Sequence, residues 1–118
     1  MFIPGLKPRR SKYGNTKTCY FGRNFDSKRE GDRYLVLRDM ERRGEITDLK
    51  LQPEFLLLSP FFYEGKKLRK ITYVADFQYR QDGQTIVEDV KGMKTDVYKL
   101  KKKLFLSKFG EGIVFREI

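Results

Sequence analysis

Two short apolar runs that flank a polar turn form the clearest pattern in the chain. They lie in residues 73–92, which read YVADFQYRQDGQTIVEDVKG, and the glycine-containing turn covers residues 80–84. Strand-length runs rich in β-branched and aromatic residues on both sides of such a turn are typical of a β-hairpin. The pattern therefore predicts two antiparallel strands over this segment.

A helix is predicted before this hairpin, from about residue 27 to about residue 43. Asp26 or Ser27 is suited to cap it, and Gly44 is suited to end it. Apolar side chains recur at helical spacing in between, so one face of the helix is expected to pack inward. That face is predicted to carry Tyr34 and Leu37, with Leu35 and Met40 beside it.

A second helix is predicted after the hairpin. Thr95 is suited to cap it, and the helix then continues to about Phe109 and ends at Gly110. Its many lysines are expected to cover the side that faces solvent, while apolar residues at helical spacing face the sheet. The apolar stripe is predicted to consist of Val97, Leu100 and Leu104.

The remaining segments complete a mixed sheet. Residues 46–58 are predicted to form one strand, or two strands interrupted at Pro53. Residues 59–70 are predicted to be a loop carrying the apolar group at residues 60–63, and residues 113–115 to be a last short strand. The order α-β-β-β-α-β predicts the α/β class, with helices packed on a mixed sheet, and the length suits one domain.

The chain is strongly basic, with a formal net charge of +10 and a pI of about 9.8. Residues 1–29 hold eight basic residues against one acidic residue, and residues 91–108 hold seven against one. Charge gathered in two segments favours a polyanionic partner, commonly nucleic acid, over a merely solubilising lysine surface. Residues 1–24 are predicted to be a basic arm, with a short strand at residues 18–22, and residues 25–118 the folded domain.

The composition excludes several kinds of site. Cys19 is the only cysteine and there is no histidine, so neither a disulfide framework nor a zinc site of cysteine and histidine can form. Nucleophilic mechanisms that need a histidine base are excluded as well. No apolar run approaches the roughly 18 residues of a membrane-spanning helix. The first residues lack the apolar segment of a signal peptide. A cytoplasmic protein without a membrane partner is expected.

Two carboxylates and an ammonium group are predicted to meet in the hairpin. Asp89 and Lys91 are two residues apart at the end of the second strand, so they face the same side. Asp76 lies in the first run and can approach them across the antiparallel pair. Each also has a structural reading, because Asp76 can end a strand and Asp89 with Lys91 can be a surface ion pair. Together they offer the hard oxygen ligands and the cation that an Mg²⁺-dependent phosphodiesterase needs.

Three further residues are candidates at the edge of this site. Glu30 lies on the inward face of the first helix and can reach the acidic residues, although Ser27 and Glu30 also form a capping box in which the glutamate serves the helix. Glu88 is expected to point to the opposite face from Asp89 and to contact a neighbouring element, unless a bulge exchanges the two. Gln52 can shape the site, although a strand break at the next residue explains it as well.

The two basic segments are the candidate surface for nucleic acid. A basic helix face is ordinarily solvated, but beside a phosphodiesterase site it becomes a track for phosphates. The N-terminal arm has the same two readings, and it can follow a groove of the DNA. The residues predicted to contact DNA are Arg9, Arg10, Lys12, Lys94, Lys99, Lys102 and Lys103.

The acidic residues resemble the pattern of the PD-(D/E)XK nuclease superfamily. Asp76 is followed, at the end of the next strand, by Asp89-Val90-Lys91, and Ala75 stands where the proline of the name would be. More closely, the chain resembles a family of small phage and prophage proteins assigned to that superfamily. The blocks that carry this resemblance span nearly the whole chain: KYGN at Lys12, FDSKREGDRYLVL from Phe25, LQPEF from Leu51, ITYVADFQY from Ile71, VEDVKG from Val87 and YKLKKKLFLSKFG from Tyr98.

The resemblance implies a restriction-endonuclease-like αβββαβ core and a metal-dependent deoxyribonuclease. The superfamily includes restriction enzymes and Holliday-junction resolvases. Asp76, Asp89, the Val90 carbonyl and Glu30 then hold Mg²⁺, for which Mn²⁺ can substitute. Lys91 is the implied catalytic lysine, and the products carry 5′-phosphate and 3′-hydroxyl ends.

The expected function is an Mg²⁺-dependent DNA endonuclease that acts on branched or otherwise structured DNA in phage replication or recombination, in the cytoplasm of a host cell. A homodimer is also expected, because cutting two strands symmetrically needs two sites, and residues 60–63 are the candidate interface. Two other classes stay open: a non-catalytic DNA-binding accessory protein, and a phage inhibitor that binds a host factor. The intact set of Asp76, Asp89 and Lys91 favours the enzyme.

Overall fold

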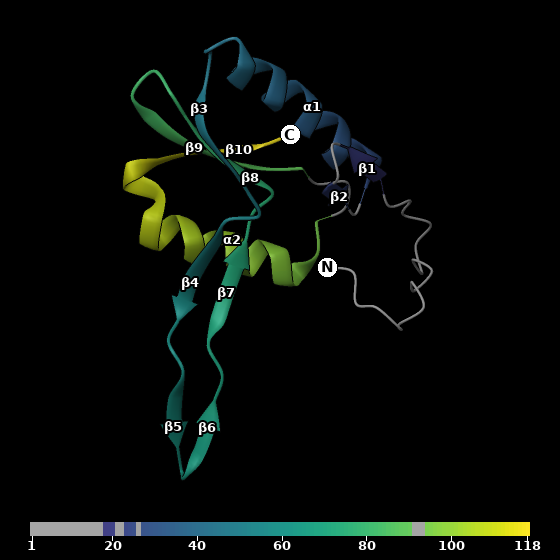
Figure 1. Ribbon diagram of the computed structural model, residues 1–118. Coiled ribbons are helices and arrows are strands. Elements are labelled where there is room, and N and C mark those ends of the chain that lie inside the picture. Colours follow the sequence, from purple (N-terminus) through teal and green to yellow (C-terminus); the bar gives the residue numbers. More distant parts are fainter. Residues whose placement is uncertain (1–17, 21–22, 26, 91–93) are drawn as a thin grey trace.

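A four-stranded mixed sheet lies between two helices, so the chain has the predicted α/β class (Figure 1). The computed structural model describes residues 18–20, 23–25, 27–90 and 94–118. The arm predicted for residues 1–24 therefore lies mostly outside the described residues. The elements follow one another as β1 (Thr18–Tyr20), β2 (Arg23–Phe25), α1 (Lys28–Arg42), β3 (Thr47–Leu51), β4 (Glu54–Leu58), β5 (Phe61–Tyr63), β6 (Lys66–Leu68), β7 (Ile71–Val74), β8 (Phe77–Gln81), β9 (Gln84–Asp89), α2 (Asp96–Phe109), a 3₁₀ turn (Gly110–Gly112) and β10 (Ile113–Glu117).

Turn chemistry fixes the centre of the sheet. Asp82 and Gly83 both have positive φ, 51° and 76°, which is the geometry of a type I′ turn and joins β8 to β9 as a tight antiparallel pair. β3 pairs antiparallel with the other edge of β8, and β10 pairs parallel with β9, which gives the order β10-β9-β8-β3. The predicted hairpin is confirmed in β8 and β9, whereas Tyr73 and Val74 belong to a separate strand, β7. Residues 46–58 form two strands separated at Pro53, which is the second of the two predicted alternatives.

Helix α1 covers one face of the sheet. The Ser27 hydroxyl accepts a hydrogen bond from the Glu30 backbone N–H at 3.1 Å, so the predicted N-cap is confirmed. Tyr34 and Leu37 form the buried stripe of α1 as predicted. These side chains pack in one apolar core with Phe25, Ile46, Phe77, Tyr79 and Ile86.

Helix α2 covers the opposite face, but in a different rotation from the predicted one. Thr95 caps it as predicted, while its buried residues are Tyr98 and Phe105. The predicted stripe is wrong, because aromatic rings at positions i and i+7 bury more apolar surface than valine and leucine and so take the inward side. In the described part of the chain, no helix is long and apolar enough to cross a membrane. The residues predicted to be inward but found exposed are Val97, Leu100 and Leu104.

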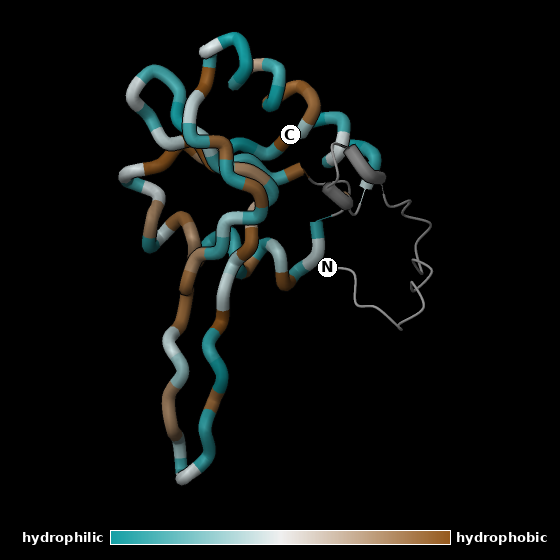
Figure 2. Tube along the Cα trace, viewed as in Figure 1, coloured by the Kyte–Doolittle hydropathy of each residue, from teal (hydrophilic) through white to brown (hydrophobic). Residues whose placement is uncertain are grey.

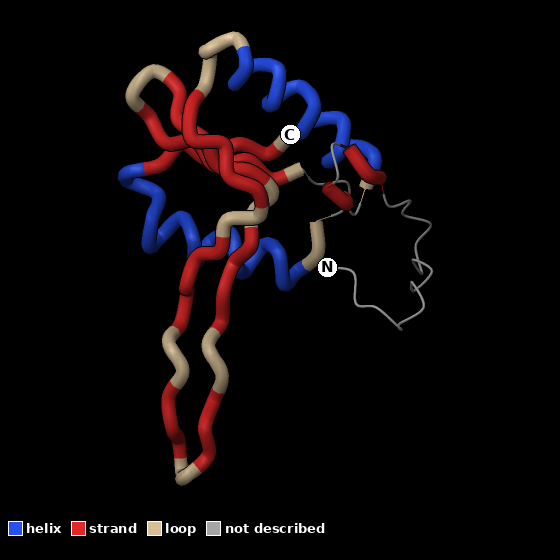
Figure 3. Tube along the Cα trace, viewed as in Figure 1, coloured by secondary structure: helices blue, strands red, loops and turns tan. Residues whose placement is uncertain are grey.

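A long hairpin projects from the sheet where a loop was predicted (Figures 1 and 3). β4 pairs with β7, and β5 pairs with β6 around a type I′ turn at Glu64 and Gly65, whose φ angles are 49° and 76°. The loop prediction for residues 59–70 is therefore wrong. The β4–β7 pairing brings the two ends of the segment together, and its aromatic residues then extend the strands.

A buried ion pair joins α1 to the end of β9. The Arg33 guanidinium donates to both carboxylate oxygens of Glu88, from Nε at 2.8 Å and from Nη2 at 2.6 Å. The Tyr79 hydroxyl also donates to this carboxylate. Glu88 is fully buried, and its hydrogen bond raises the pKa of Arg33, while burial and Glu88 raise the pKa of Tyr79 to about 12. Glu88 thus points away from Asp89 and contacts a helix, as predicted.

Replacing Arg33 by alanine should lower the free energy of unfolding by about 3–5 kcal/mol, because it leaves the Glu88 charge buried without its cation. Urea denaturation monitored by circular dichroism measures the free energy of unfolding. Lys28→Ala is the matched control, since it breaks an exposed ion pair with Asp32 and should cost at most about 0.5 kcal/mol. Equal losses in the two variants would contradict the structural role of the Arg33–Glu88 pair.

Candidate metal and nucleic-acid site

Asp76 lies at a kink, where the chain leaves the projecting hairpin and enters the central sheet. The strand run therefore breaks at Ala75 and Asp76 and resumes at Phe77. Three backbone hydrogen bonds hold the kink: Gln52 N–H to the Asp76 carbonyl at 2.9 Å, Ala75 N–H to the Pro53 carbonyl at 3.1 Å, and Asp76 N–H to the Glu88 carbonyl at 3.1 Å. Gln52 has a φ of 51°, in the left-handed region, and it lies in the turn between β3 and β4. Gln52 thus contacts the kink through its backbone.

Asp76 and Asp89 meet across the paired strands. Phe77 lies opposite Glu88 in the register. Asp76, which precedes Phe77, and Asp89, which follows Glu88, are therefore neighbours. Asp89 is fully buried and Asp76 is half-buried. The Val90 N–H donates to Asp76 Oδ2 at 2.6 Å, so one oxygen of this carboxylate turns toward the end of β9.

Glu30 from α1 contributes negative charge to the same place. The residue is 6% exposed, and its backbone N–H belongs to the helix cap. Burial, then the charge of Glu30, and more weakly that of Asp89, raise the pKa of Asp76 to about 8, against the lowering effect of the Val90 N–H. Three carboxyl groups from α1, β9 and the kink therefore gather where ionisation of all three is costly.

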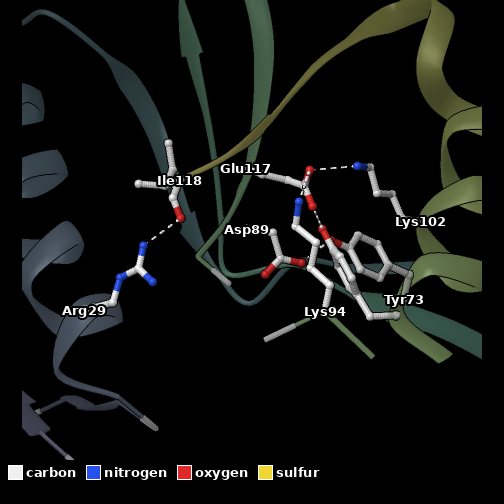
Figure 4. A network of polar contacts seen from close by, with 8 residues as sticks. Arg29, Tyr73, Asp89, Lys94, Lys102, Glu117 and Ile118 are labelled. Atoms are coloured by element: carbon white, nitrogen blue, oxygen red, sulfur yellow. Dashed lines mark hydrogen bonds and ion pairs between the residues drawn. The ribbon is translucent and has the colours of Figure 1, made fainter. Parts of the chain in front are cut away.

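Tyr73 and the C-terminal strand complete the surroundings of Asp89 (Figure 4). The Tyr73 hydroxyl donates to Asp89 Oδ2, and burial followed by this bond raises the pKa of Tyr73. The Ile118 N–H donates to the Asp89 carbonyl at 2.9 Å, and Arg29 donates to the Ile118 carbonyl at 3.2 Å. Tyr73 was not predicted to lie at the site, because its approach to Asp89 depends on the kink at Asp76 and no local pattern indicates that kink.

Glu117 organises the cations beside this site (Figure 4). Its carboxylate accepts from Lys102 at 2.7 Å, from the Tyr98 hydroxyl at 2.6 Å and from Lys94 at 3.4 Å. The bond to Lys102, and then the bond to Tyr98, lower the pKa of Glu117 to about 2. Glu117 therefore stays ionised at physiological pH and holds two lysines in place on the α2 side of the sheet.

The predicted DNA-contacting lysines of α2 gather around one shallow hollow. Its volume is about 310 Å³. Arg9, Arg10, Lys12 and Lys91 lie outside the described residues, so their roles stay predictions. The hollow is lined by Lys94, Lys99, Lys102 and Lys103, together with Tyr98 and Leu106.

The chemistry of the acidic residues fits a hard cation. Among the residues that the structure describes, no three His, Cys, Asp or Glu side chains are arranged to hold a metal ion. Mg²⁺ in proteins is commonly bound by one or two carboxylates and keeps several waters, so Asp76 and Asp89 with a backbone carbonyl would be a sufficient protein contribution. The Val90 N–H donates to Asp76 Oδ2, so the backbone of Val90 lies beside this carboxylate.

The fold and the site together define an α/β protein with buried carboxylates beside a basic helix. The chain belongs to the family described as Protein of unknown function (DUF1064), whose model matches residues 10–116. No curated protein and no solved structure matches the chain.

Asp76→Asn should stabilise the protein in EDTA, and increasingly so as pH rises. The folded state keeps a proton on Asp76 that the unfolded chain releases above its ordinary pKa, so the wild type loses stability between about pH 4 and about pH 8 and the variant does not. The gain should reach about 1–3 kcal/mol near pH 9. Asparagine can still accept from the Val90 N–H.

Thermal unfolding across this pH range measures the difference. Asp82→Asn is the matched control, because Asp82 lies in an exposed turn at positive φ, which asparagine tolerates. A variant Asp76→Asn whose melting temperature tracks the wild type at every pH would contradict the crowding of the three carboxyl groups.

Proposed function

We propose that the chain is an Mg²⁺-dependent DNA endonuclease with a restriction-endonuclease-like core of the PD-(D/E)XK type. The observation that carries this proposal is the convergence of Asp76 and Asp89 at the end of a buried strand pair, with Glu30 beside them. Burying carboxylates together lowers stability, and such groups are concentrated where a cation or a reaction requires them. The order of the sequence blocks and the four-lysine hollow support the same reading.

The residues of the chain have separate roles in this proposal. Asp76, Asp89 and the Val90 carbonyl would hold Mg²⁺, and Glu30 would add a carboxylate through a shared water or directly. The ion, when bound, supplies positive charge that offsets the charge developing on the scissile phosphate. Lys91 would orient the attacking water by hydrogen bonding and would stabilise the phosphate in the transition state.

The lysines of α2 would hold the DNA backbone. Phosphate contacts of this kind position DNA without reading its sequence, and a domain of this size offers little further surface for base-specific contacts. Branched or otherwise structured DNA from phage replication or recombination is therefore the proposed substrate. A non-catalytic DNA-binding protein would share the lysines but would have no use for buried carboxylates.

Asp76→Asn and Asp89→Asn should each abolish Mg²⁺-dependent cleavage and leave DNA binding in EDTA nearly unchanged. Loss of one ligand carboxylate removes the ion and several kcal/mol of transition-state stabilisation, which is about 10³-fold or more in rate. Supercoiled plasmid and a four-way junction, each with Mg²⁺ or EDTA on a gel, provide the measurement. Asp82→Asn should cleave like the wild type. Cleavage at the wild-type rate by either site variant would contradict the proposed ligand assignment. DNA binding by the wild type without any cleavage would favour the non-catalytic accessory protein.

Glu30→Gln should raise the Mg²⁺ concentration needed for half-maximal cleavage by about tenfold, as for an outer or weak ligand. The Ser27 cap uses the backbone N–H of residue 30, which the substitution keeps, so the melting temperature in EDTA should not fall. A Mg²⁺ titration followed by thermal unfolding separates the two roles. A lower melting temperature with an unchanged Mg²⁺ titration would assign Glu30 to the helix cap alone.

Replacing Lys99 and Lys103 by glutamine should flatten the salt dependence of DNA binding by about 1–2 units of log K against log salt, since each phosphate contact contributes about −0.9. The pair Lys94 and Lys102 should contribute less, because Glu117 already engages both. Fluorescence anisotropy across a salt series in EDTA measures the slope. Lys50→Gln on the edge strand β3 is the control and should leave it unchanged. An unaltered slope in the Lys99 and Lys103 variant would exclude the hollow as a DNA contact.

A further inference from the structure

The projecting hairpin ends in aromatic side chains that the described part of the fold leaves exposed. β5 and β6 form its tip, and β4 and β7 form its root against α2 (Figure 1). Figure 2 shows hydrophobic positions continuing along the hairpin, away from the sheet. Phe62 is 71% exposed and Tyr63 is 64% exposed. Large exposed aromatic side chains on a protruding element are typical of a binding surface.

The two most exposed aromatic residues of the tip, Phe62 and Tyr63, each lie opposite a lysine. In the register of β5 and β6, Phe62 is opposite Lys67 and Tyr63 is opposite Lys66. Directly opposite residues point to the same face, so each face of the ribbon presents one of these rings next to one ammonium group. Arg69 and Lys70 follow β6 and add positive charge toward the root, where Lys70 lies 3.7 Å from the Glu54 carboxylate. The type I′ turn fixes the geometry of the tip.

We infer that this tip binds unpaired bases of the DNA substrate, by stacking them on Phe62 and Tyr63 while Lys66 and Lys67 contact the flanking phosphates. Stacking on aromatic rings combined with positive charge is how proteins hold single-stranded nucleic acid. The positive charge of the tip favours nucleic acid over a protein partner or a second copy of the chain. The cores of protein–protein interfaces are depleted in lysine, and a second copy of this basic tip would repel the first. A polyanion with exposed base faces satisfies both the rings and the lysines.

This inference rests on the proposed function for the identity of the partner, and it makes the substrate more specific. β7 ends at Val74, two residues before Asp76, so the hairpin starts at the acidic site. Its residues from Gly65 to Val74 span about 30 Å at ~3.3 Å per residue. One turn of duplex DNA spans about 34–36 Å. The preferred substrate is therefore duplex DNA with unpaired bases roughly one turn from the scissile phosphate, as at a branch or a gap.

Fluorescence anisotropy in EDTA with three labelled probes tests this: a plain duplex, the same duplex with a short single-stranded gap, and a four-way junction. The variant Phe62→Ala with Tyr63→Ala should bind the gapped duplex and the junction about 10- to 100-fold more weakly, and the plain duplex less than about threefold more weakly. Phe62→Trp should bind like the wild type. Leu58→Ala, at an exposed apolar position of the same hairpin, is the control and should leave the affinity for every probe unchanged.

A base analogue provides a second measurement. 2-Aminopurine in the gap should lose fluorescence when the wild type binds, because stacking on an aromatic ring quenches it, and should keep its fluorescence with the double alanine variant. Lys66→Gln with Lys67→Gln should instead weaken binding of all three probes and flatten the salt dependence by about 1–2 units.

Four outcomes would overturn the inference. Equal losses for plain and gapped duplex, or unchanged 2-aminopurine fluorescence, would exclude base stacking. Light scattering that finds a dimer for the wild type and a monomer for the double alanine variant, while the variant keeps its selectivity among the DNA probes, would assign the tip to contact between copies of the chain. All binding is measured without Mg²⁺, so absence of cleavage by the wild type would overturn the endonuclease proposal and leave base binding intact. A wild type that cleaves DNA but binds the gapped and the plain duplex equally well would overturn the hairpin inference alone.

Discussion

Two consecutive carboxylates are buried at the end of β9, and the fold on both sides of the sheet is arranged around them. Glu88 and Asp89 face opposite sides because strand side chains alternate. A buried carboxylate without partners would cost more than the narrow stability margin of a small domain. The α1 side therefore supplies Arg33 and Tyr79 to Glu88, and the α2 side supplies Tyr73 to Asp89.

The negative charges of Glu88 and Asp89 are balanced unequally by their neighbours. This difference distinguishes a structural carboxylate from a candidate site carboxylate. Glu88 has a bidentate guanidinium, so its charge is neutralised within the fold. Asp89 has a neutral hydroxyl on one oxygen and a second carboxyl group, Asp76, nearby. An excess of negative charge in a buried place is unfavourable unless a cation enters, and it is the condition under which a divalent ion binds most favourably. Adjacent residues of one strand thus serve stability and the candidate site.

Sequence patterns correctly predicted the features that depend on a few neighbouring residues. The cap at Ser27, the turn at Asp82 and Gly83, and the opposite orientation of Glu88 and Asp89 each follow from a few neighbouring residues, and the structure agrees with them. The hairpin at residues 59–70 was not predicted, because its pairing depends on β4 and β7, which are far apart along the chain. The rotation of α2 was also wrong, since the competition between aromatic and aliphatic faces is decided by the shape of the sheet. Tyr73 was missed for the same nonlocal reason.

The kink at Asp76 connects the acidic site with the hairpin. A continuous strand would have carried β7 straight into the sheet, whereas the bonds from Gln52 and to Pro53 turn the chain at this residue. At the other side of the root, the Lys108 ammonium donates to the carbonyls of Leu56 and Leu57 at 3.3 and 3.4 Å, which ties α2 to β4. The root is thus held both by the sheet and by the helix that carries the lysine hollow. Because the same backbone positions fix the carboxylate and the direction of the hairpin, a DNA molecule bound along α2, as proposed, would meet both at a defined separation.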